Sequence, residues 1–211
     1  CLAAEIANES LPAITDNPVM LGPDQDHANG RMISTGGYHN PHAVMAMDAV
    51  TAASVNLITI AGRLAAKLLD GAVSLLPDQF GLGGTPGYLG CLPMAITGYE
   101  EEARGHAMAT LLPGSESGGF GQDDIASPVF LAWSKQEKTG ALLEAALASL
   151  SFIALRAFTF TDRPIPPRLE NLAKEISGFM PDPDKGQVLG PAASGLEARL
   201  RARVYGSRGA R

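Results

Sequence analysis

The 211-residue chain is 45% hydrophobic and 18% charged, which is enough to bury a core and is typical of a globular protein of one or two domains. Its net charge of −6 and pI near 5.2 argue against a nucleic-acid surface, because such surfaces are basic. Its basic cluster, five arginines between residues 199 and 211, lies in the terminal tail. We therefore expect small-molecule or protein partners, no nucleic acid and no membrane.

Two cysteines, Cys1 and Cys91, form no recognisable metal-binding or redox spacing. So few cysteines favour a reducing compartment, and we expect a cytoplasmic protein. Residues 1–9 resemble the last turns of an amphipathic helix, and no initiator methionine or signal peptide opens the chain. These features suggest a fragment that starts within a folded structure.

A long helix is expected from Pro41 to about Leu69, because proline is tolerated in a first turn and Asp70-Gly71 offers a glycine at the end. Its uncharged run at 49–62 is shorter than the about 20 strongly apolar residues that span a membrane. The run is rich in alanine, serine and threonine, which let neighbouring helices approach closely. We expect this helix in the middle of a helical bundle.

Further helices are expected downstream, and no strand pattern of useful length occurs. One starts at Ser127-Pro128, where an N-cap residue precedes a proline. Its second half is almost wholly apolar at 145–155, so it must enter a core larger than one small domain supplies. The expected helices cover residues 88–106, 128–158, 168–178 and 193–203. We predict a central helical-bundle portion with site loops at 1–161, followed by short helices and a basic tail at 162–211.

Three glycine-rich or polar segments between these helices are candidate sites, at residues 15–40, 77–87 and 113–126. The sequence GLGGTPG at 81–87 resembles a phosphate-binding loop only superficially. It lacks the preceding strand and the following Lys-Ser/Thr that would hold a phosphate. We interpret it as a turn.

The motifs in these segments occur in a recognisable order. ITDNPVML at 14–21 is followed by GGYHNPHAVMAMDAV at 36–50, and together they resemble the SDNP…GNFH passage of the aromatic amino acid ammonia-lyases, the histidine and phenylalanine ammonia-lyase family. The resemblance covers nearly the whole chain and matches the family's C-terminal portion. Further matching segments are AAKLLDGAVSLLPDQFG at 65–81, EEEARGHA at 100–107, GQDDIAS at 121–127 and PDPDKGQVLGP at 181–191.

The resemblance implies an all-α fold, a long-helix bundle of the ammonia-lyase type that is completed by oligomerisation into a homotetramer. It also implies an electrophilic methylidene-imidazolone cofactor (MIO), made from an Ala-Ser-Gly tripeptide in the family's N-terminal half. The triplet at 193–195 does not match that context, and we interpret it as the turn that starts a helix. We therefore expect the MIO from a missing N-terminal portion, which would be a partner of this chain.

By the same resemblance, Tyr38 takes the place of the phenylalanine that flanks the electrophile and the substrate, and Gly37 replaces the family's usual asparagine. The ring of Tyr38 is either an aromatic wall or a source of a hydroxyl for proton transfer. His39 belongs to the same motif and is either a substrate-binding or a structural residue. His42 is expected in the first turn of a helix. A metal site would need a third ligand, which the sequence does not identify, so no metal is expected.

The second candidate pair is Gln122 and Asp123, which align with an amide and an acidic or amide position close to the family's substrate. A carboxylate suits this chemistry because the substrate carries an ammonium group and loses a carbon-bound proton. The alternative for these aspartates is helix capping, which we favour for Asp124. Asp16 and Asn17, before Pro18, are expected in a structural turn.

We predict an amino acid ammonia-lyase that converts an aromatic or histidine-like amino acid to an acrylate, with Tyr38 and Asp123 as catalytic residues and His39 and Gln122 as substrate-binding residues. The electrophile, the family's loop tyrosine and its carboxylate-binding arginine are missing, so the chain would be an incomplete catalyst by itself. Three alternatives stay open: one subunit of a split lyase, an aminomutase, and a non-catalytic assembly protein of the same fold. Asp123 favours histidine or another polar substrate.

Overall fold

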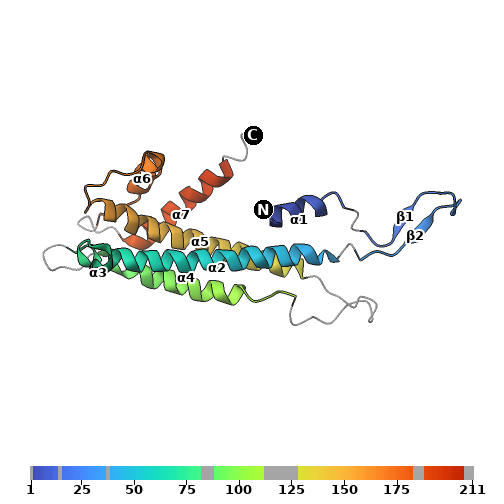
Figure 1. Ribbon diagram of the computed structural model, residues 1–211, viewed down its shortest axis with the longest axis horizontal. Helices are drawn as coiled ribbons and strands as arrows, with labels where there is room; N and C mark the ends of the chain where they lie inside the picture. The colour runs from blue at the N-terminus through green and yellow to red at the C-terminus, as the bar shows by residue number, and fades with distance from the viewer. Residues whose placement is uncertain are drawn as a thin grey trace. The chain divides into compact units, whose positions relative to one another are not determined.

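The computed structural model describes residues 2–13, 16–36, 39–81, 88–111, 128–182 and 188–206, with side chains described up to residue 202. The chain is mostly helical (Figure 1), which confirms the all-α class. Short 3-10 turns occur at Asp78–Phe80, Tyr88–Cys91 and Pro167–Leu169. The helices and strands are α1 (Leu2–Ser10), β1 (Val19–Leu21), β2 (Arg31–Ile33), α2 (Pro41–Leu69), α3 (Gly71–Ser74), α4 (Leu92–His106), α5 (Val129–Phe158), α6 (Glu170–Ser177) and α7 (Leu189–Gly206).

The chain forms two compact units. The first unit comprises Cys1–Ala53 and His106–Lys138, and the second comprises Ser54–Gly105 and Thr139–Arg211. Helices α2 and α5 therefore contribute residues to both. The boundary expected at residue 161 follows the order of the sequence and stays a prediction, whereas the contacts group the C-terminal short helices with α4 and the later part of α5.

In the first unit, β1 and β2 form an antiparallel hairpin in which Val19 pairs with Ile33. The sequence did not predict it, because three-residue strands are too short to show an alternating pattern. The base of the hairpin is held by Asn17, whose side-chain oxygen accepts hydrogen bonds from Thr35 N at 2.9 Å and Ser34 Oγ at 3.1 Å. The expected structural turn is therefore confirmed, and it contains a cis peptide bond between Asn17 and Pro18.

The second unit contains the larger apolar core. Helix α4 packs beside α2 (Figure 1), and a Cβ on Gly62 would lie 3.2 Å from Ile96 Cγ2. The small residues of α2 thus allow the close helix approach that the sequence predicted. The fully buried large apolar side chains of this unit are Ile58, Leu89, Ile96, Phe152, Ile153 and Leu196.

Helix α2 has the expected bounds, but the expectation that Gly71 ends it was wrong. The Asp70 side chain accepts a hydrogen bond from Ala72 N at 2.9 Å and so caps α3, which begins at Gly71. The left-handed residue comes later, at Leu75, with φ of 60°. An aspartate beside a glycine fits both a helix start and a helix end, and here the side-chain cap prevails.

Helices α2 and α5 are each long and apolar enough to cross a membrane, by length and composition alone. In the most apolar 18-residue stretch of each helix, the buried share is 28% in α2 and 33% in α5. Both helices therefore carry apolar surface that the described residues of this chain leave uncovered.

Candidate functional site

The start of α2 carries the only one of the four expected site residues that falls among the described residues, His39. The His39 backbone N–H donates to Gly36 O at 3.1 Å, and the residue is half-buried. Asn40 follows, and its side-chain oxygen accepts from Ala43 N at 3.3 Å, which caps the first turn. His42 lies exposed in that turn, as expected. The expected site residue Tyr38 lies outside the described residues.

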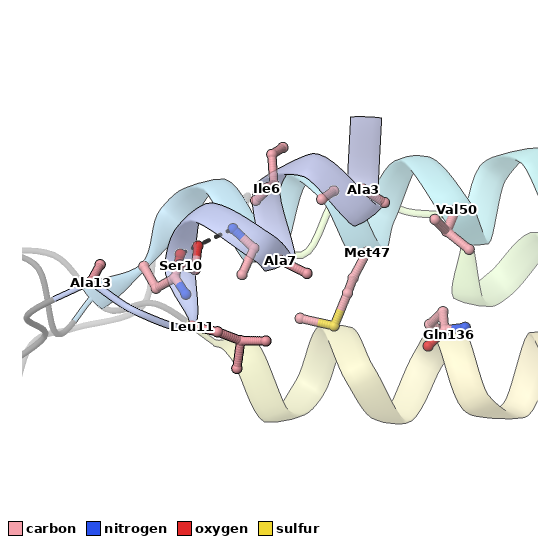
Figure 2. Close-up of a pocket in the computed structure, with 12 residues that line it drawn as sticks. Ala3, Ile6, Ala7, Ser10, Leu11, Ala13, Met47, Val50 and Gln136 are labelled. Atoms are coloured by element: carbon pink, nitrogen blue, oxygen red, sulfur yellow. Dashed lines mark hydrogen bonds between the residues drawn. The ribbon is translucent and has the colours of Figure 1, made fainter. Parts of the chain in front are cut away.

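A largely apolar groove of about 610 Å³ lies beside this turn, within the first unit (Figure 2). Its wall consists mainly of small and apolar side chains of α1 and α2, including Ala7 and Met47. Polar groups enter it from Ser10, Asn40 and Gln136. The sequence did not predict the groove, since it forms only when α1 lies along the start of α2.

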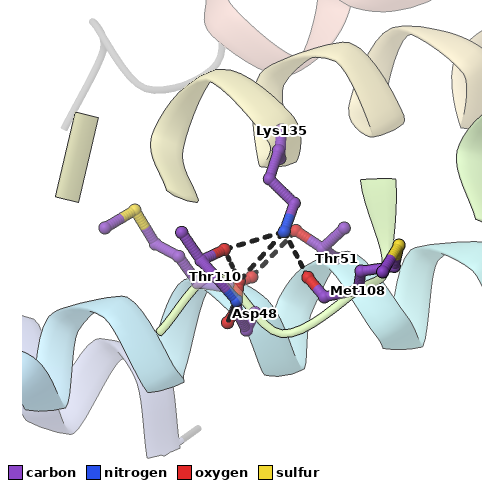
Figure 3. A network of polar contacts seen from close by, with 6 residues as sticks. Asp48, Thr51, Met108, Thr110 and Lys135 are labelled. Atoms are coloured by element: carbon purple, nitrogen blue, oxygen red, sulfur yellow. Dashed lines mark hydrogen bonds and ion pairs between the residues drawn. The ribbon is translucent and has the colours of Figure 1, made fainter. Parts of the chain in front are cut away.

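A polar cluster, which we call the Asp48 clasp, joins α2, α5 and the residues after α4 (Figure 3). Asp48 Oδ2 accepts from Thr110 N at 2.7 Å, and Asp48 Oδ1 accepts from Thr110 Oγ1 at 2.5 Å. Lys135 Nζ donates to Thr110 Oγ1 at 2.8 Å and also to the Met108 carbonyl. The Thr110 hydroxyl therefore donates to the carboxylate and accepts from the ammonium group.

The clasp is mostly buried. The Lys135 side chain is 12% exposed and that of Asp48 is 19% exposed, and Lys135 Nζ lies 3.9 Å from Asp48 Oδ1. Buried charges are costly unless each is paired and hydrogen-bonded, and both conditions hold here. The sequence did not predict this cluster, because Thr110 lies 62 positions after Asp48 and neither belongs to a recognisable motif.

The expected site residues Gln122 and Asp123 lie outside the described residues, as does Asp124. In the sequence, Met108 and Thr110 of the clasp precede the 112–127 stretch and Lys135 follows it. The first unit thus contains the start of α2, the groove and the clasp.

The acidic run of α4 belongs to the second unit. Glu100 accepts from Thr59 Oγ1 at 2.9 Å and pairs with Arg104, so it links α4 to α2. This geometry gives Glu100 a structural role. Within the described ranges, no group of three or more histidine, cysteine, aspartate or glutamate side chains could hold a metal ion.

The Ala193-Ser194-Gly195 triplet was expected to be the turn that starts a helix, but α7 already begins at Leu189 and the triplet lies inside it. A Cβ on Gly195 would lie 3.2 Å from the ring of Phe179, so this glycine packs closely against an aromatic side chain. Cyclisation of the tripeptide would break the helical hydrogen bonds and this contact. The triplet therefore does not fit as the precursor of an MIO group.

Comparison with known proteins establishes the family. No curated protein matches this chain significantly in sequence. The fold resembles the crystal structure of histidine ammonia-lyase from Trypanosoma cruzi, with a TM-score of 0.78 and 17% identity over 95% of this chain and 40% of that one. It also resembles Pantoea agglomerans phenylalanine aminomutase, with a TM-score of 0.77 and 18% identity over 92% of this chain and 37% of that one.

A third similar structure is ergothionase from Treponema denticola, with a TM-score of 0.80 and 12% identity over 95% of this chain and 40% of that one. The chain thus spans about 40% of the length of the structures that it matches. A family model described as aromatic amino acid lyase matches residues 1–178. The chain therefore belongs to the aromatic amino acid lyase family.

Proposed function

We propose that the complete enzyme containing this chain eliminates ammonia from an aromatic or histidine-like amino acid and releases an acrylate. The family match over residues 1–178 carries this proposal. The helical fold, which is shared with a histidine ammonia-lyase, supports it. Because the chain spans only part of such enzymes, it supplies one part of the site and other residues supply the rest.

In this proposal Asp123 and Tyr38 are the catalytic residues that the chain contributes. A carboxylate at Asp123 would attract the substrate's ammonium group or accept the carbon-bound proton, and Tyr38 would flank the reacting carbon with its ring. His39 and Gln122 would hydrogen-bond the substrate. The electrophilic MIO would come from outside this chain, because the triplet at 193–195 does not fit it.

We also propose that the enzyme is a cytoplasmic homotetramer. Several large apolar side chains of α2 and α5 are exposed in the single chain, which favours burial against other copies. Phe130, for example, is 82% exposed. The others on these two helices are Met45, Leu57, Ile60, Leu64, Leu131, Trp133 and Leu147.

An aminomutase is the second candidate function, favoured by the likeness to a phenylalanine aminomutase. That reaction returns the ammonia to the neighbouring carbon, so it releases a β-amino acid in place of an acrylate. A split lyase would carry the same chemistry on two polypeptides, and a mass measurement of the intact gene product distinguishes it from a single-chain enzyme. A non-catalytic assembly protein would keep the bundle without either activity.

The test is an assay of the complete enzyme against a panel of amino acids, including histidine, phenylalanine and tyrosine. We expect ammonia and an ultraviolet-absorbing acrylate from at least one of them. A β-amino acid without net ammonia release would establish the aminomutase instead. If a folded, assembled enzyme gave neither product from any member of the panel, the proposed function would be wrong.

A further inference from the structure

The Asp48 clasp has no role in the proposed chemistry, yet it is the most deeply buried ionic cluster of the first unit among the described residues. It joins three segments that are distant in sequence: α2 through Asp48, the residues after α4 through Met108 and Thr110, and α5 through Lys135. Lys135 is 12% exposed and Thr110 is 8% exposed. A cluster in this position fixes the relative geometry of those segments.

We propose that Asp48, Thr110 and Lys135 are positioning residues, which hold residues 108–110 and the start of α5 against the start of α2. This inference rests on the proposed function, because the stretch of sequence between Thr110 and Lys135 carries Gln122 and Asp123. None of the three clasp residues needs to contact the substrate.

The hydrogen-bond pattern supports this role. Asp48 accepts both the backbone N–H and the hydroxyl of Thr110, which fixes the chain direction where that stretch begins. Lys135 donates to Met108 O and Thr110 Oγ1 from the second turn of α5, where that stretch ends. Thr110 and Lys135 are therefore both tied to one carboxylate.

Asp48 lies on α2, which begins two positions after His39. It follows Pro41, the first residue of α2, by seven positions, which is about two turns of helix. The clasp thereby couples residues 108–110 and the start of α5 to the start of α2. Catalytic groups must be held within a fraction of an ångström of their working geometry, so loosening this coupling should lower turnover more than substrate binding.

The experiment compares Lys135→Met with Lys138→Met in the complete enzyme. Lys138 is an exposed lysine of the same helix, less than one turn further on, and it is the matched control. We expect Lys135→Met to lower kcat about tenfold with KM changed less than about twofold, whereas Lys138→Met leaves both unchanged. Lys135→Arg, which keeps the positive charge, should restore part of the loss.

The second readout is hydrogen exchange in peptides that cover residues 107–111 and 129–135, with the part of α5 at 139–158 as the internal reference. Lys135→Met should raise exchange in those two stretches about tenfold and leave the reference unchanged. If Lys135→Met does not fold, Thr110→Val removes only the hydroxyl and should give a smaller change of the same kind. In the double variant the two effects should be less than additive, because both act through one cluster.

Wild-type exchange at 107–111 and 129–135 in both variants, or equal kinetic losses in Lys135→Met and Lys138→Met, would overturn the proposal. If the wild-type enzyme shows no activity on any amino acid, the proposed function fails. The exchange measurement then still decides whether the clasp holds residues 108–110 and the start of α5 in place.

Discussion

The two units of this chain are stabilised in different ways. In the second unit, large apolar side chains such as Phe152 and Ile96 are fully buried, and the unit has the character of a scaffold. In the first unit, Val44 is the largest fully buried apolar side chain among the described residues, and the charged Asp48 clasp joins its elements. The difference indicates that apolar packing stabilises the second unit, whereas buried polar contacts hold together the elements of the first unit.

Two phenylalanines on α5 test this difference most strongly. Phe152 is 0% exposed in the second unit, and Phe130 is 82% exposed in the first. Phe152→Ala should lower the opening free energy of the second unit by about 3–5 kcal/mol, because it leaves a cavity in a packed core. Native-state hydrogen exchange of α4 and α5 in the complete enzyme measures this change.

Phe130→Ala is the matched control for that measurement. It should change the opening free energy of the second unit by less than about 0.5 kcal/mol, as is usual for an exposed position. It should instead weaken the proposed tetramer, which sedimentation can measure. Equal effects of the two substitutions on exchange would show that the two regions do not differ in packing.

Substitution of two helical glycines should change the stability of the second unit by a smaller amount. A Cβ on Gly98 in α4 would meet nothing within 4 Å, whereas a Cβ on Gly62 in α2 would lie 3.2 Å from Ile96 Cγ2. Gly98→Ala should therefore stabilise the unit by about 0.5–1 kcal/mol, through the higher helix propensity of alanine. Gly62→Ala should gain less, since Ile96 must move. A larger gain for Gly62→Ala in thermal unfolding would contradict the close packing of α2 on α4.

The smallest effect that we expect concerns the pKa of Asp24, which lies between β1 and β2 in the first unit. The His27 ring, which lies 3.0 Å from Asp24 Oδ1, lowers the pKa of that carboxyl below its ordinary value of 3.8, and backbone N–H groups of His27 and Asp26 act in the same direction. A lowered pKa means that the stabilising contribution is present above pH 3.8 and is lost as the pH falls through the folded-state pKa.

An NMR titration of the Asp24 carboxyl tests this assignment. His27→Ala should raise the Asp24 pKa toward 3.8, because the largest cause of the shift is removed. His42→Ala, which removes an exposed histidine from α2, should leave the Asp24 pKa unchanged. An unchanged Asp24 pKa in His27→Ala would show that the ring does not contribute.

The helical scaffold was predictable from local sequence. Pro41 marked the start of α2, and the long apolar runs of α2 and α5 predicted helices that need other helices around them. These features were readable because helix caps, proline positions and apolar periodicity are local properties. The resemblance to the family could be recognised because several short motifs occur in the family's order, although the identity to the histidine ammonia-lyase structure is only 17%.

The contacts of the first unit were not predictable in this way. The hairpin strands are too short for a pattern, and the groove depends on how α1 lies beside the start of α2. The clasp combines an aspartate, a threonine and a lysine, each of which is unremarkable in its own helix or turn. Only the folded chain brings them together. The roles of Tyr38, Gln122 and Asp123 stay predictions.

The most direct test of the central claim is the turnover of Asp123→Ala in the complete enzyme, with Asp124→Ala as the neighbouring control. If the first unit supplies a substrate-facing carboxylate, Asp123→Ala should lower turnover by more than about tenfold and leave the proposed tetramer intact, whereas Asp124→Ala should change turnover much less. Tyr38→Phe should lower turnover only slightly if the ring serves only as an aromatic wall of the site. Wild-type turnover in Asp123→Ala would contradict the account and leave that residue with a capping role.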